Sequence, residues 1–163
     1  MTLPGTALAI LVLLATPGPT NTLLALAGAE RGWRGAVRLI PAELAGYLAT
    51  VVPLSLAGAA LLARLPGARD ALALLAAAWV LLLAWRLWRE EEGAAGPSVT
   101  ARRVAVTTLL NPKALVFGLV LVPAPAWGAL LLHLLAFAVL VVVVDSAWAA
   151  LGALLRGRGA ALP

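Results

Sequence analysis

The stretch that decides the fold is residues 127–155, which read WGALLLHLLAFAVLVVVVDSAWAALGALL. Its only ionisable side chains are one histidine and one aspartate. A helix needs about 20 mostly apolar residues to cross the hydrocarbon core of a bilayer, and this run is longer. The run does not alternate apolar and polar residues, as a strand of a membrane barrel would. It therefore predicts a transmembrane helix.

The rest of the chain has the same character. Of its 163 residues, 63% are hydrophobic and 12% are charged. A soluble domain has about half its residues apolar and about a quarter charged, so this composition leaves no room for one. Only helices and closed barrels satisfy their backbone hydrogen bonds inside lipid. We therefore expect an all-α, polytopic bundle of transmembrane helices embedded in the lipid bilayer.

Apolar periodicity and turn residues divide the chain into about five spans within a single transmembrane domain, residues 1–163. Residues 1–89 would form a first repeat, residues 90–103 a polar linker, and residues 104–163 a second repeat. With three spans in each complete repeat, the second repeat would be inverted relative to the first and incomplete. The expected spans cover about residues 4–29, 39–63, 71–88, 104–122 and 127–155.

The arginines predict the orientation in the membrane, because short loops on the cytoplasmic side carry an excess of Lys and Arg. In a soluble protein the net charge of +5 would suggest nucleic-acid binding. Here the arginines lie between apolar spans, so topology accounts for them and we expect no nucleic-acid partner. The N-terminus would lie outside and the C-terminus in the cytoplasm. Nine arginines fall on the cytoplasmic side (Arg31, Arg34, Arg38, Arg86, Arg89, Arg102, Arg103, Arg156 and Arg158) and two on the other (Arg64 and Arg69).

Two of the spans contain helix-breaking segments, Pro17-Gly18-Pro19 and Asn111-Pro112-Lys113. A proline inside a helix removes one backbone hydrogen bond, so Pro112 should free the carbonyl of Thr108. A packing kink would explain a single proline in a membrane helix. Here both breaks have polar neighbours and open corresponding halves of the chain, the pattern that indicates a transport site.

Lys113 is the only lysine among the twelve basic side chains, and it lies inside an apolar span. A cation at membrane depth is costly and is treated as functional by default, and a buried lysine, unlike an arginine, can lose its proton. Asn111 and Pro112 would begin a half-helix whose amide end favours a carboxylate. The alternative is a lysine that extends its charge to the membrane interface.

Two acidic side chains also lie within predicted spans, Glu43 and Asp145. Tyr47 and Thr50 share the helical face of Glu43. Carboxylates in membrane helices often belong to proton relays, which makes both residues candidates for proton coupling. A protonated acid that hydrogen-bonds a neighbouring helix remains an equal alternative for each.

The remaining motifs carry less information. Gly28-x-x-x-Gly32 is a weak signal for helix contact, and Trp33 and Trp85 fall at span ends, where tryptophan anchors a helix at the membrane interface. The chain has no Cys and no metal-ligand cluster, catalytic triad or phosphate loop in its sequence. We expect no enzyme, no catalytic residue, no metal and no cofactor.

Three segments in order resemble the lysine exporter (LysE/RhtB) family of amino-acid exporters. They are PGPTNT at residues 17–22, RGWRG at residues 31–35 and TLLNPKA at residues 108–114. Residues 79–89 also resemble the third helix of that family, and the resemblance covers about residues 3–148.

The resemblance implies that the chain exports amino acids or related small metabolites, driven by proton exchange through Glu43 or Asp145. Family members carry a sixth hydrophobic segment beyond those found here, so we expect a homodimer that completes the fold. The alternative is a truncated or non-transporting membrane protein that acts through helix packing with a partner subunit. The substrate would bind between the breaks, at Pro17, Gly18, Pro19, Asn21, Asn111, Pro112 and Lys113.

Overall fold

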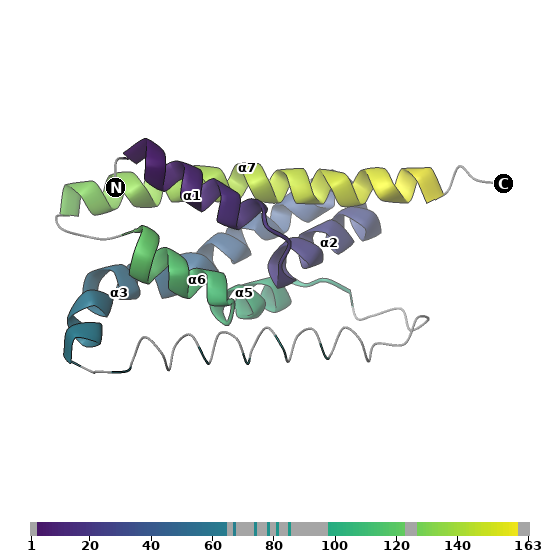
Figure 1. The fold of residues 1–163 in the computed structure, drawn as a ribbon. Coiled ribbons are helices and arrows are strands. Elements are labelled where there is room, and N and C mark those ends of the chain that lie inside the picture. Colours follow the sequence, from purple (N-terminus) through teal and green to yellow (C-terminus); the bar gives the residue numbers. More distant parts are fainter. Residues whose placement is uncertain are drawn as a thin grey trace.

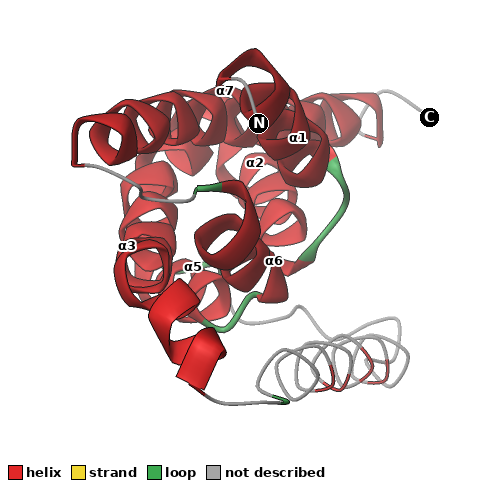
Figure 2. Cartoon of the chain, turned by 60° about the vertical axis from the view of Figure 1, so that its left-hand side comes forward, coloured by secondary structure: helices red, strands yellow, loops and turns green. Residues whose placement is uncertain are grey.

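The computed structural model describes residues 3–64, 67, 74, 78, 81, 85, 98–122 and 127–159. Every regular element in these residues is a helix, so the expected all-α class is confirmed (Figure 2). Apart from single positions, the expected span at residues 71–88 lies outside the described part, as do the turn at residues 123–126 and most of the linker. The elements are α1 (Leu3–Ala15), α2 (Pro19–Ala36), η1 (Val37–Leu39), α3 (Ile40–Arg64), α5 (Ala101–Leu109), α6 (Pro112–Val116), the π-helical turn η2 (Phe117–Leu121) and α7 (Trp127–Gly159).

Two helical stretches are long and apolar enough to cross a membrane, judged by length and composition. They are Pro19–Ala57 and Gly128–Arg156, and Pro4–Ala15 is a shorter apolar helix. The first stretch is not one straight helix, because Gly32 takes φ 73° and ψ 169° inside it. Only glycine adopts this conformation without strain. The chain therefore turns at Gly32, before it enters α3. Helix α5 begins at Ala101, slightly before the expected start at residue 104.

Helix α7 is the helix against which α1 and α2 both pack. It runs along the whole length of the molecule, with α1 and then α2 packed along it in succession (Figure 1). The α2 contact is a close backbone crossing, because a Cβ at Gly28 would lie 2.1 Å from the carbonyl oxygen of Ala149 and one at Gly152 would lie 1.8 Å from that of Ala25. Small residues allow this approach in membrane helices. The expected contact at Gly28 is confirmed, whereas Gly32 has nothing within 4 Å and forms the turn instead.

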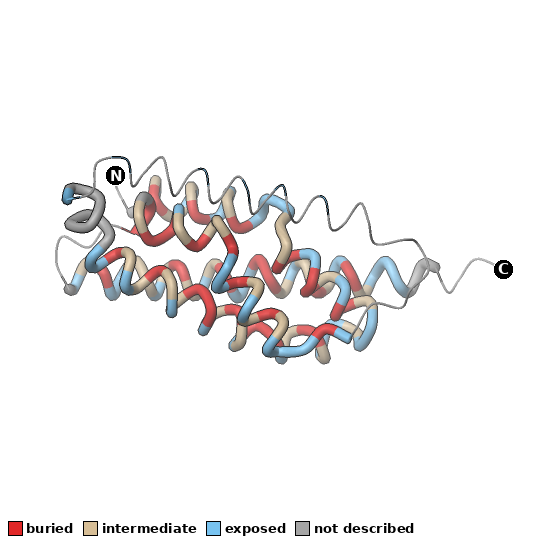
Figure 3. Tube along the Cα trace, turned by 90° about the horizontal axis from the view of Figure 1, so that it is seen from below, coloured by how far each residue is buried: buried red, intermediate tan, exposed pale blue. Residues whose placement is uncertain are grey.

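Buried residues recur between exposed ones along the helices (Figure 3), and the apolar ones form two clusters. One cluster includes Leu14, Tyr47 and Phe137, and the other includes Leu24 and Val104. Along α2, α3, α5 and α7, buried polar residues fall between the members of the two clusters. We call these residues the polar layer: Thr20, Asn21, Glu43, Thr108, Asn111 and Asp145.

One end of the bundle is tied together by charged side chains. Arg31 donates a hydrogen bond to the carbonyl oxygen of Val99, and the amide of Val99 donates to Glu30 Oε2 at 3.3 Å. Arg156 donates a hydrogen bond to the backbone carbonyl oxygen of Glu30. The side-chain carboxylate of Glu30 also forms a 3.6 Å ion pair with Arg31. The end of α2, the residues before α5 and the end of α7 therefore meet, and α2, α5 and α7 each carry arginines near this end.

The crossing of α2 and α7 predicts that Gly→Ala changes the free energy of unfolding differently at two positions of α7. Gly152→Ala would drive a methyl group into the backbone of α2 and should cost about 3 kcal/mol of unfolding free energy. Gly128→Ala has nothing within 4 Å of the added atom and should be neutral or stabilising by up to about 1 kcal/mol. Unfolding of the detergent-solubilised variants in SDS, followed by circular dichroism, measures both. Equal stability of the two variants would contradict the crossing.

Candidate functional site

The first break separates α1 from α2 at Thr16, Pro17 and Gly18. Pro19 occupies the first position of α2, where its missing N–H is not needed and its fixed φ suits the helix. The last carbonyls of α1 have no donors within their own helix. Asn21 supplies hydrogen-bond donors at this end, because its Nδ2 donates to the carbonyl oxygens of Leu14 at 2.8 Å and of Thr16 at 3.1 Å. This asparagine holds the broken end of α1 in place.

The second break separates α5 from α6. Asn111 caps α6, since its Oδ1 accepts a hydrogen bond from the amide of Lys113 at 3.0 Å, and Pro112 begins the helix. The expectation that Pro112 leaves the carbonyl of Thr108 free is wrong. The chain tightens into a turn after Leu109, so that the amide of Asn111 donates to the carbonyl oxygen of Thr108 at 3.0 Å.

The two breaks meet inside the bundle. Asn111 Nδ2 donates to Thr20 Oγ1 at 3.0 Å, across 91 positions of sequence. The ammonium group of Lys113 donates to the carbonyl oxygen of Thr16. A Cβ at Gly18 would lie 3.1 Å from both Cε and Nζ of Lys113, so the absence of a side chain at Gly18 leaves room for the lysine. The structure thus brings together the break residues predicted from sequence: Pro17, Gly18, Pro19, Asn21, Asn111, Pro112 and Lys113.

Glu43 on α3 and Asp145 on α7 also lie in the polar layer, 0% and 1% exposed. Their carboxyl groups interact with each other, and the ammonium group of Lys113 acts on both. All four carboxyl oxygens are buried and receive no hydrogen bond from a donor of the described residues, and the two carboxyl groups lie within hydrogen-bond range of each other. Two carboxylates can only accept hydrogen bonds, so a hydrogen bond between them requires one shared proton. The two acids found separately in the sequence form one buried pair.

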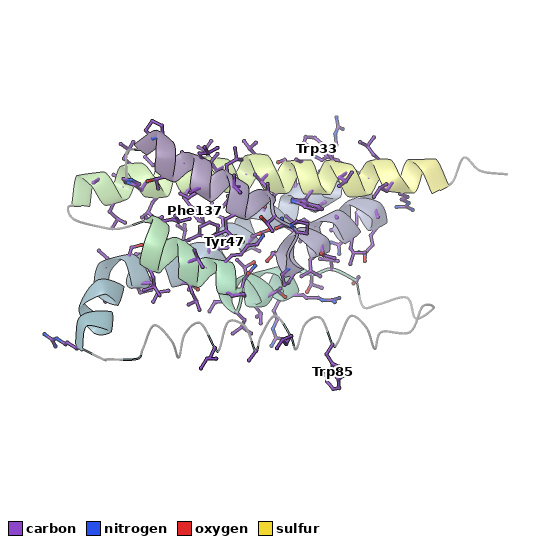
Figure 4. The ribbon with its side chains drawn as sticks, in the orientation of Figure 1. Trp33, Tyr47, Trp85 and Phe137 are labelled. Atoms are coloured by element: carbon purple, nitrogen blue, oxygen red, sulfur yellow. The ribbon has the colours of Figure 1, made fainter. Side chains whose placement is uncertain are left out.

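Tyr47 belongs to the same site, although it was not among the site residues predicted from the sequence. It lies one helical turn from Glu43, it is 0% exposed, and its hydroxyl has no hydrogen-bond partner in the described part of the chain. Its ring packs edge-on against Phe117 at 5.6 Å and Phe137 at 5.5 Å between centroids. Tyr47 and Phe137 point toward one another in the middle of the bundle (Figure 4). The signal that could have found it is its position on the buried face of Glu43.

Other candidates from the sequence lie away from the polar layer. A ring nitrogen of His133 lies 2.7 Å from the carbonyl oxygen of Ala129, one turn earlier in α7. Trp33 is 46% exposed and donates to the carbonyl oxygen of Ser146 at 3.2 Å, and Trp85 is 52% exposed. Both tryptophans lie at the periphery (Figure 4). Within the described ranges, no three His, Cys, Asp or Glu side chains are grouped as metal ligands.

Comparison with known proteins identifies the family. The model of the LysE type translocator family matches residues 11–162, which include both breaks, Lys113 and the acid pair. No curated protein and no solved structure matches the chain. Members of the family are membrane transporters rather than enzymes. With a match over almost its whole length and two broken helices that meet in a buried polar layer, the chain belongs to the LysE type translocator family, whose members move amino acids or related compounds across membranes.

Proposed function

We propose that the chain exports amino acids or related small metabolites across the cytoplasmic membrane of a bacterium and exchanges them for protons. One observation carries the proposal: two broken helices from separate halves of the chain meet, through a buried hydrogen bond between Asn111 and Thr20 and a more exposed one from Lys113 to Thr16. Broken helices that meet near the bilayer midplane form the substrate sites of many secondary transporters.

The carboxylate of the substrate would bind at the start of α2. Gly18 is the N-cap residue of this helix and has no side chain, so no capping side chain accepts hydrogen bonds from the first amides of α2. The ammonium group of Lys113 lies beside Gly18. A helix N-terminus and a cation both attract an anion. The start of α6 is less suitable than expected, because Pro112 has no amide hydrogen and Asn111 already caps the amide of Lys113.

Glu43 and Asp145 would carry the coupling proton. The support is their burial without hydrogen bonds in the polar layer, beside the lysine of the carboxylate site. A charged pair of carboxylates is costly inside the bilayer, so the pair favours a state that holds a proton. Release of that proton requires access to water from one side of the membrane at a time.

The rest of the transport model concerns the movements and the assembly. The two apolar clusters cover the polar layer on either side, so export requires each cluster to open in turn. Residues 1–89 and 104–163 would act as the two inverted repeats, with the N-terminus outside and the C-terminus in the cytoplasm. The protein would function as a homodimer, for which the exposed leucines and valines along α7 provide an apolar surface.

Efflux of amino acids from preloaded cells tests the proposal. Loss of a charge-assisted hydrogen bond costs about 1.5–3 kcal/mol, so Lys113→Leu should lower the export rate about tenfold or more. Arg64→Leu is the matched control, since it removes one exposed cation from the far end of α3, and it should export at the rate of the unaltered chain. Export by Lys113→Leu at that same rate, with equal amounts of protein in the membrane, would refute the proposed site.

Cysteine labelling tests the orientation, because the chain contains no natural cysteine. A membrane-impermeant maleimide should label Arg64→Cys in intact cells. It should label Arg34→Cys only after the membrane is permeabilised. The reverse pattern would place the N-terminus in the cytoplasm and would exclude export in the proposed direction through this topology.

A further inference from the structure

Buried polar atoms without a hydrogen-bond partner gather in the polar layer and beside it. In the described part of the chain, the buried side-chain oxygen atoms without a hydrogen bond are the carboxyl oxygens of Glu43 and Asp145 and the hydroxyl of Tyr47. These side chains are 0%, 1% and 0% exposed. Buried polar groups in proteins are nearly always hydrogen-bonded, so this concentration of unpaired oxygens points to a missing donor.

The three groups converge from two helices. Glu43 and Tyr47 lie one turn apart on α3, and Asp145 faces them from α7. The three groups are near enough for the charges of both carboxyl groups to act on the Tyr47 hydroxyl. The rings of Phe117 and Phe137, 4.9 Å apart, pack against the tyrosine ring. The two carboxyl groups and the hydroxyl therefore lie together, and apolar rings border them.

A primary ammonium group fits this region chemically. It carries one positive charge and three N–H donors, which correspond to two carboxyl groups and one hydroxyl. A hard metal ion is a poorer match, since Mg²⁺ and Ca²⁺ require six or more oxygen ligands. Lys113 is a built-in ammonium that acts on both acids, but its hydrogen bond goes to the carbonyl oxygen of Thr16 at the break.

We propose that Glu43, Asp145 and Tyr47 bind the protonated amino group of the substrate, and that this amino group displaces the proton which the acid pair holds when the site is empty. The inference rests on the proposed export function and assigns the two ends of the substrate to different groups. The carboxylate lies at Gly18 and Lys113, and the amino group lies at the acid pair.

This arrangement couples transport to protons by competition. An ammonium group and a proton each bring one positive charge, so replacing one by the other leaves the charge at the pair unchanged. The displaced proton leaves to water on the side from which the substrate enters. The other titratable groups that face the pair from the described helices are Lys113 on α6 and Tyr47 on α3.

The test is proton release on binding by the purified full-length chain in detergent. The twenty standard amino acids are first screened by thermal shift, and the one with the largest shift is compared with its N-acetyl derivative and its carboxamide. In weakly buffered solution with a pH-indicator dye, the amino acid should release about one proton for each molecule bound. The affinity of the chain for the amino acid should fall about tenfold for each unit by which the pH is lowered, in the pH range in which the empty acid pair holds a proton.

The derivatives and variants assign the effect to the pair. The N-acetyl compound has no ammonium group and should release no proton, whereas the carboxamide should bind more weakly and still release one. Glu43→Gln and Asp145→Asn should each abolish proton release. His133→Gln is the control on α7, because it removes an ionisable side chain that lies outside the polar layer; this variant should release protons as the unaltered chain does.

The outcomes separate this inference from the export function. Binding without proton release would overturn the inference, and so would equal binding of the N-acetyl compound. Binding without proton release is also the result expected if the ammonium group of Lys113 occupies the acid pair. In either case, efflux still decides whether the chain exports amino acids. Proton release that persists in both acid variants would assign it to another group and also overturn the inference. If no amino acid binds or is exported, the proposed function fails together with the inference. Should the acid variants not fold, the comparison of the amino acid with its N-acetyl form on the unaltered chain still decides.

Discussion

The structure depends on one constraint, which is that backbone groups at membrane depth must find hydrogen-bond partners inside the protein. The breaks before α2 and before α6 each leave groups that no helix can satisfy. Asn21 and Lys113 donate to the carbonyls at the end of α1, and Asn111 caps α6 and reaches Thr20. Each break is thus completed by polar side chains, and partners exchanged between the breaks hold the two halves of the chain together.

The polar layer that results is confined by apolar packing on both sides. On α7, Val144 before Asp145 belongs to one apolar cluster and Ala149 after it to the other, and α2 and α3 each lead from the layer into one of the two clusters. The close crossing at Gly28 and Gly152 fixes α2 against α7 and so sets the level at which Asp145 faces Glu43. A buried layer with charged and unpaired groups is costly for stability alone. It is well suited to a site that must bind a polar ligand away from water.

The sequence was sufficient where the signal is local. Proline positions located both breaks, and charge within apolar runs identified Lys113, Glu43 and Asp145. It failed where partners come from elsewhere in the chain: the carbonyl of Thr108 is satisfied by a turn, and the roles of Gly32 and Tyr47 depend on backbone angles and tertiary contacts. Pairing across 91 positions, as between Thr20 and Asn111, cannot be read from periodicity. It depends on the tertiary packing of α2 against α5.

The most direct test of the central claim, that the two breaks meet and form the substrate site, is a disulfide between them. In the cysteine-free chain, Thr20→Cys and Asn111→Cys together should form an intramolecular disulfide under mild oxidation in membranes, because their side chains are in contact. A transported amino acid should slow its formation. The pair Thr20→Cys and Arg64→Cys should form none. Failure of the first pair to crosslink, or crosslinking that no amino acid alters, would contradict the account.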